Sequence, residues 1–107
     1  MKQPEAERDI QRTILDYLSL HRVFHYRQNT GGFKKGNHFV KFSVKGAPDF
    51  IAVQKGIYIG IEVKKPDTDP TPDQVAFGQS LEESGGIYIV ARRLEDVIEG
   101  LKRIKLT

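Results

Sequence analysis

Two carboxylates and a lysine occur at a spacing that suits metal-assisted phosphoryl chemistry. Asp49 follows Pro48, and after twelve further residues the chain continues with Glu62, Val63 and Lys64. Glu62 and Lys64 lie two apart in a predicted strand, so their side chains share one face. Taken singly, Asp49 is typical of a turn, and the other two are typical of a solvated strand end. Their combination favours a functional site.

The turn between the two acidic residues decides whether they meet. If Lys55-Gly56 is a two-residue hairpin turn, Gln54 pairs with Ile57, and Asp49 falls opposite Glu62. Directly opposite residues have Cβ atoms roughly 4.5 to 5.5 Å apart. A three-residue turn breaks this register unless a bulge restores it. With the shorter turn, the sequence predicts an acidic pair.

Two adjacent carboxylates repel each other, and a cation between them removes the repulsion. Oxygen ligands of this kind suit Mg²⁺ or Mn²⁺, which retain waters and bind substrate phosphate directly. Such an ion can activate a bound water, polarise the phosphoryl oxygen and stabilise the leaving oxygen. Lys64 is expected to be protonated. Charge stabilisation and water positioning are therefore favoured over a general-base role.

An α/β arrangement is predicted to position these residues. Helical spacing of apolar residues predicts a helix over residues 5–20, a short helix ended by Gly85-Gly86, and a last helix from Leu94 to Leu101. Strands are predicted at residues 40–45, 50–53, 57–64 and 87–91. The order is αβββαβα, which indicates an α/β layer structure with a mixed central sheet flanked by helices.

The first predicted helix carries polar residues on its inward stripe. Stepping back from Leu18 through Ile14 by helical spacing reaches Gln11 and then Glu7. An acidic residue near a helix N-terminus is also favoured by the helix dipole alone. The inward position of Glu7 favours a role in the site.

Composition narrows the class of protein. The chain has 107 residues, which is typical of a single domain, and it has no cysteine. A disulfide framework, a thiolate zinc site and a cysteine nucleophile are excluded, and the three histidines have no ligand spacing. The polar start of the chain and the lack of a long apolar run predict a cytoplasmic protein without membrane insertion. No glycine-rich nucleotide motif is present, so no nucleotide cofactor is expected.

A basic segment runs from Arg22 to Lys45. It contains no acidic residue, and aromatic residues are interleaved with its cations. Lysines often protect an exposed sheet edge, which is the structural interpretation. Clustered Lys and Arg also displace the condensed counterions of a nucleic acid, which is the functional one. The cations are Arg22, Arg27, Lys34, Lys35, Lys41 and Lys45.

The motifs together resemble the PD-(D/E)XK nuclease superfamily and, within it, the VRR-NUC (virus-type replication-repair nuclease) domain. Asp49 after Pro48, followed by Glu62 to Lys64, matches the superfamily signature, and the αβββαβ order resembles its restriction-endonuclease-like core. The resemblance covers nearly the whole chain. It also includes Glu7 to Gln11 as an opening motif, Arg27 to Gly32 as an Arg/Asn/Gly loop, Gly46 to Asp49 as a central motif, and Gln74 with Phe77 as a later helix. The connection from Pro66 to Thr71 differs from the shorter glycine-bearing linker expected, which leaves substrate contacts there open.

The resemblance assigns roles to individual residues. Asp49, Glu62 and the main-chain carbonyl of Val63 would bind the metal, and Glu7 would approach it directly or through water. Lys64 would act on the attacking water. Gln74 would lie near the site, but residues 71–74 also read as a capping box, so its two roles stay open. The expected nucleic-acid contacts are Arg27, Asn29, Lys34, Lys35, Lys41 and Lys45.

The implied function is a DNA endonuclease that uses Mg²⁺ or Mn²⁺ in a bacterial or phage-infected cell and leaves 5′-phosphate and 3′-hydroxyl ends. Small viral-type members of the family resemble Holliday-junction resolvases, so branched DNA and a C2 homodimer are expected. One alternative is a module that binds nucleic acid through the Arg22–Lys45 segment without cutting it. Another is a hydrolase of small phosphate esters.

Overall fold

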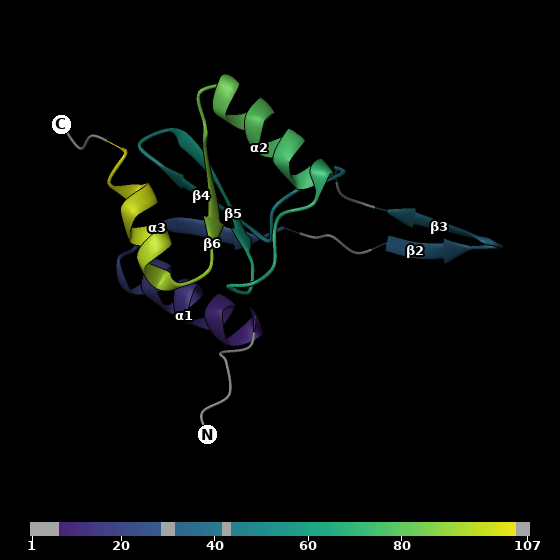
Figure 1. Ribbon diagram of the computed structural model, residues 1–107, viewed down its shortest axis with the longest axis horizontal. Helices are drawn as coiled ribbons and strands as arrows, with labels where there is room; N and C mark the ends of the chain where they lie inside the picture. The colour runs from purple at the N-terminus through teal and green to yellow at the C-terminus, as the bar shows by residue number, and fades with distance from the viewer. Residues whose placement is uncertain (1–6, 29–31, 42–43, 105–107) are drawn as a thin grey trace.

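A mixed sheet forms the centre of the protein (Figure 1). The computed structural model describes residues 7–28, 32–41 and 44–104, without the side chains of residues 32–33 and 40–41. The sheet has the order β1-β4-β5-β6, and its strands are β1 (Phe24–Arg27), β4 (Phe50–Gln54), β5 (Ile57–Val63) and β6 (Ile87–Ala91). β1, β4 and β5 are antiparallel neighbours, whereas β6 runs parallel to β5. The predicted mixed α/β sheet is confirmed.

Helices cover both faces of this sheet. α1 (Glu7–Leu20) and α3 (Leu94–Leu101) pack on the face that carries Ile59, Ile61 and Val63, and these side chains form one core with Ile10, Ile14, Leu18 and Val97. α2 (Pro72–Glu83) covers the opposite face, where its Leu81 lies against Gly60 of β5. Side chains alternate along a strand, so Glu62 projects from the α2 face.

The β4–β5 turn has the shorter of the two lengths considered from the sequence. Gln54 pairs with Ile57 and Phe50 with Ile61, so the turn consists of Lys55 and Gly56. Both have positive φ, 54° and 77°, as a tight hairpin turn requires. The register predicted for the acidic pair is confirmed.

A second, separate hairpin projects from the body (Figure 1). Its strands β2 (Gly32–Lys35) and β3 (His38–Lys41) pair only with each other among the described strands. The strand predicted at residues 40–45 coincides with β3 only at residues 40–41, it does not extend over residues 44–45, and residues 42–43 lie outside the described residues. β3 ends at Lys41, and Val44 lies outside any strand with 68% of its surface exposed.

The strand that completes the central sheet is β1, which the apolar pattern did not predict. It pairs along the outer edge of β4, and its two aromatic residues, Phe24 and Tyr26, are exposed. An edge strand whose apolar side chains face solvent does not show the alternation typical of a half-buried strand. The first of the three consecutive strands was consequently predicted too far along the chain, at residues 40–45 instead of 24–27.

The remaining elements agree with the sequence expectations. The first helix begins at Glu7 within the described residues, and α2 ends at Glu83 before the glycine pair.

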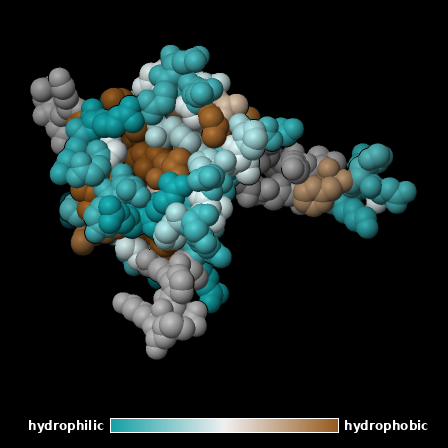
Figure 2. All heavy atoms as spheres, viewed as in Figure 1, coloured by the Kyte–Doolittle hydropathy of each residue, from teal (hydrophilic) through white to brown (hydrophobic). Residues whose placement is uncertain are grey.

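None of the helices in the described ranges has the length and apolar character needed to cross a bilayer. On the face drawn in Figure 2, apolar side chains gather over β6 between α2 and α3, and hydrophilic residues surround them.

Candidate active site

Asp49 lies one residue before β4 and is held by both its side chain and its main chain. Its Oδ2 accepts a hydrogen bond of 2.8 Å from the main-chain N–H of Val63. Its carbonyl oxygen accepts one of 2.9 Å from the main-chain N–H of Gln28. The side chain is therefore fixed beside the end of β5, where the register places it opposite Glu62.

The loop before Asp49 packs tightly against neighbouring elements. Gly46 has a φ of 79°, and a Cβ atom there would overlap the main-chain carbonyl of Asp73 at the start of α2. Pro48 is buried, with its Cγ 3.0 Å from the position of a Cβ on Gly60. The loop is thus clamped between α2 and β5, which fixes where β4 begins.

Glu62 is a buried acidic residue, with 4% of its surface exposed. Burial raises the pKa of its carboxyl to about 8, and repulsion by Asp49 and a hydrogen bond with Asp49 add to this effect. Lys64 opposes the rise in the pKa, and Glu7 contributes to it. The structure therefore places Asp49, Glu62 and Lys64 together at the end of β5, and Glu7 acts on Glu62 through its charge.

Metal binding by these residues stays a prediction. Within residues 7–28, 32–41 and 44–104, no set of three or more His, Asp or Glu side chains is placed to hold a metal ion. The donors that remain are the two carboxylates of Asp49 and Glu62. Glu7 lies within electrostatic range of Glu62 and is not a third ligand of such a set. Its contact through water, and a role for the Val63 carbonyl, stay predictions.

Gln74 occupies the N3 position of α2 in a capping box. Its Oε1 accepts a hydrogen bond of 2.9 Å from the main-chain N–H of Thr71, and its own N–H donates to Thr71 Oγ1 at 3.2 Å. The capping role is confirmed, and the catalytic role stays a prediction.

The predicted nucleic-acid contacts fall on two parts of the molecule. Lys34 and Lys35 are exposed on the projecting β2–β3 hairpin. Lys45 lies near the body and forms an exposed ion pair of 3.7 Å with Asp73. Arg27 stacks over the ring of Phe50 at 5.1 Å from its centroid. Asn29 and the side chain of Lys41 lie outside the described residues.

Tyr88 is a polar residue near the site that the sequence analysis did not single out. Burial, followed by the charges of Glu62 and Asp49, raises its pKa to about 12. The available signal was its position as the one polar side chain in the apolar strand Ile87–Ala91.

These features define an α/β domain with a mixed four-stranded sheet and an acidic pair, Asp49 and the buried Glu62, at the end of its central hairpin. No protein-family model and no curated protein matches the chain. Among solved structures, a protein described as a VRR_NUC domain protein has a similar fold, with a TM-score of 0.60 over 94% of this chain and 88% of that chain. The two sequences are 21% identical, so the likeness concerns the fold. The VRR-NUC resemblance in the sequence is confirmed at this level.

Proposed function

We propose that the protein is a divalent-metal-dependent DNA endonuclease. The observation that carries the proposal is the buried Glu62 carboxyl beside Asp49, with Lys64 on the same strand face, in a fold of the VRR_NUC type. A buried carboxyl beside a second carboxylate costs stability unless a cation neutralises the pair, so a purely structural role does not account for it.

The chemistry of the donors fits Mg²⁺ or Mn²⁺. Mg²⁺ is commonly held by one or two carboxylates and keeps several waters, so two protein carboxylates are sufficient. Asp49 and Glu62 would hold the ion, with the Val63 carbonyl as a further oxygen and Glu7 reaching it through water. When bound, the ion would supply an activated water and neutralise charge on the phosphate.

The other residues of the site would orient the reactants. The Lys64 ammonium would stabilise charge at the scissile phosphate and position the attacking water. Asp49 would keep its orientation through the Val63 N–H. Gln74, at the N-terminus of α2, would contribute an amide near the substrate.

The β2–β3 hairpin supports DNA as the substrate. A two-stranded ribbon fits the major groove of a duplex, and Lys34 and Lys35 supply the charge for phosphate contacts. We infer a preference for branched or junction DNA, which a C2 homodimer with two sites would serve. Light scattering with and without a four-way junction tests the assembly, and a monomer in both samples contradicts it.

The test compares cleavage by the wild type with that by Asp49→Asn and Lys64→Gln. Labelled four-way junction, flap, duplex and single-stranded DNA are each incubated with Mg²⁺, Mn²⁺ or EDTA. We expect metal-dependent cutting that both variants lose. The matched controls Asp16→Asn and Lys65→Gln, at exposed positions, retain it.

Other outcomes identify the alternatives. Tight binding that is independent of metal, with no cutting of any substrate, indicates a nucleic-acid-binding module. Turnover of a small phosphate ester that DNA does not inhibit indicates a small-molecule hydrolase.

A further inference from the structure

The hydroxyl group of Tyr88 is buried and has no hydrogen-bond partner among the described residues. Buried polar groups in native proteins are nearly always paired, because an unpaired one lowers stability. A phenylalanine in this position would fill the same space without that cost. The hydroxyl therefore requires an explanation outside the packing of the fold.

The ring of Tyr88 is held between β5 and α2 by two glycines. Its Cδ1 lies 3.5 Å from the position of a Cβ on Gly60, and its Cδ2 lies 2.5 Å from the position of one on Gly78. α2 reaches this close to β6 only because Gly78 has no side chain. The main-chain N–H of Tyr88 also donates a 2.6 Å hydrogen bond to Glu82 Oε2. The direction of the ring is consequently fixed from both sides.

The register directs this ring toward the acidic pair. Gly60 pairs with Tyr88 and Glu62 with Val90, so Tyr88 and Glu62 are diagonal neighbours on the α2 face. Diagonal neighbours are within reach when one is an aromatic residue. The charges of both Glu62 and Asp49 act on the phenol. A tyrosine in such surroundings keeps its proton and serves as a donor.

We infer that Tyr88 is a positioning residue of the proposed metal site, whose hydroxyl donates a hydrogen bond to the Glu62 carboxylate when Glu62 holds a divalent cation. The inference rests on the proposed function. A carboxylate that binds a cation through one oxygen presents its second oxygen as an acceptor, and such supporting hydrogen bonds commonly contribute 10- to 100-fold to metal affinity. This contact would give the Tyr88 hydroxyl the partner that it lacks among the described residues.

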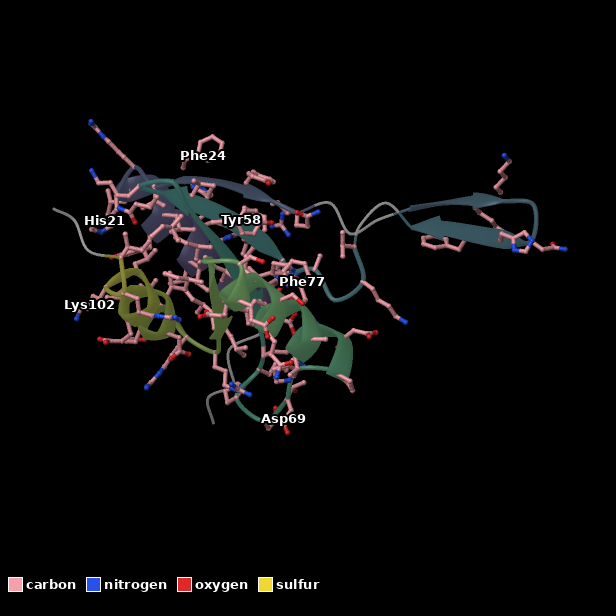
Figure 3. All side chains as sticks on the ribbon, turned by 90° about the horizontal axis from the view of Figure 1, so that it is seen from above. His21, Phe24, Tyr58, Asp69, Phe77 and Lys102 are labelled. Carbon is pink, nitrogen blue, oxygen red and sulfur yellow. The ribbon has the colours of Figure 1, made fainter. Side chains whose placement is uncertain are left out.

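The experiment measures Mn²⁺ binding to Tyr88→Phe by titration calorimetry. We expect binding about tenfold weaker than that of the wild type. Tyr58→Phe is the matched control (Figure 3). Tyr58 lies on the same face of β5 as Glu62 but near the opposite end of the strand, and 36% of its surface is exposed. Its affinity for Mn²⁺ should equal that of the wild type. Glu62→Gln should abolish binding and so identify the site that is titrated.

A second measurement separates positioning from folding. In EDTA, Tyr88→Phe should unfold at the same urea concentration as the wild type or at a higher one, because the lost hydroxyl was unpaired. A clear loss of stability would show that the hydroxyl is bonded within the cation-free fold and would overturn the inference.

The two proposals fail in different ways. If the wild type binds Mn²⁺, Glu62→Gln does not, and Tyr88→Phe binds as tightly as the wild type, the inference about Tyr88 is wrong and the metal site stands. If the wild type binds no Mn²⁺, the metal site and the inference are both wrong.

Discussion

The Oδ2 atom of Asp49 accepts a hydrogen bond of 2.8 Å from the main-chain N–H of Val63, the residue between Glu62 and Lys64. One carboxylate thus satisfies a main-chain donor of the strand that carries the second carboxylate and the lysine. Val63 is fully buried, so its N–H has no access to water as a substitute. The site and the end of β5 are therefore coupled in stability as well as in chemistry.

The two ways of removing the Asp49 charge should differ in their effect on stability. Asp49→Ala leaves the Val63 N–H unpaired and should lower the free energy of unfolding by about 1–3 kcal/mol. Asp49→Asn retains an oxygen that can accept this bond, so we expect little loss of stability. Both variants should lose binding of Mn²⁺. Urea unfolding in EDTA, followed by calorimetric titration, measures the two effects. Equal stability of the two variants would show that the hydrogen bond contributes nothing.

The pKa of Glu62 predicts how stability depends on pH in the absence of metal. Its folded-state pKa is about 8, raised from the model-compound value of 4.5 by burial and by Asp49. Above pH 4.5 the unfolded chain releases this proton while the folded protein retains it, so the unfolded state binds fewer protons. Stability contributed by Glu62 is fully present below that pH and is lost as the pH rises through about 8. The loss should be on the order of several kcal/mol.

Urea unfolding in EDTA across this pH range measures the effect, with Glu62→Gln as the comparison. The glutamine does not titrate, so its curve should be flatter, and at alkaline pH the variant should be more stable than the wild type. Added Mg²⁺ should restore the stability of the wild type at alkaline pH, because a ligand that binds only the folded state stabilises it. If the stability of the wild type and that of Glu62→Gln change in parallel with pH, Glu62 is not the group that causes the pH dependence.

The contact of Gly46 with α2 predicts that Gly46→Ala loses more stability than conformational strain alone would cause. Gly46→Ala and Gly56→Ala both place a Cβ on a residue with similar positive φ, 79° and 77°. The Cβ at position 56 meets nothing within 4 Å, whereas the one at position 46 would overlap the carbonyl of Asp73. Gly56→Ala should cost about 1 kcal/mol, and Gly46→Ala should cost clearly more. Gly46→Ala should also weaken Mn²⁺ binding, because the loop that it displaces ends at Asp49. If both variants lose the same free energy of unfolding, backbone strain alone explains the loss, and the contact of Gly46 with Asp73 contributes nothing.

The parts of the site that depend on local register could be predicted from the sequence. Lys55-Gly56 sets the pairing of β4 with β5, and this pairing places Asp49 opposite Glu62 without further tertiary information. The inward position of Glu7 follows from helical spacing in the same way. These residues are defined by periodicity within single elements and by one short turn.

Features that depend on the environment of a strand could not be predicted in this way. β1 was not predicted because Phe24 and Tyr26 are exposed, which conceals the usual alternation. The position of Tyr88 near the acidic pair arises from the parallel pairing of β6 with β5 and from the close approach of α2 at Gly78. No sequence pattern within β5, β6 or α2 specifies that Tyr88 lies near the acidic pair.

The β2–β3 hairpin should contribute to DNA affinity through charge. Its far end is largely hydrophilic (Figure 2), and Lys34 and Lys35 are exposed there. Each phosphate contact lowers the slope of log affinity against log salt concentration by about 0.9, so Lys34→Ala/Lys35→Ala should reduce the magnitude of this slope by about 2. Fluorescence anisotropy with labelled duplex at several salt concentrations measures the slope. Mn²⁺ binding should not change, because neither lysine belongs to the acidic site.

Arg93→Ala/Lys102→Ala is the matched control for charge. Arg93 precedes α3 without a side-chain capping bond, and Lys102, which follows α3, lies at the end of the molecule opposite the hairpin (Figure 3). This pair removes two positive charges from the protein, as the hairpin variant does, but from a surface that should not contact DNA. We expect its salt slope to match that of the wild type. If both double variants shift the slope equally, the protein binds DNA through its overall charge, and the hairpin has no specific role in binding.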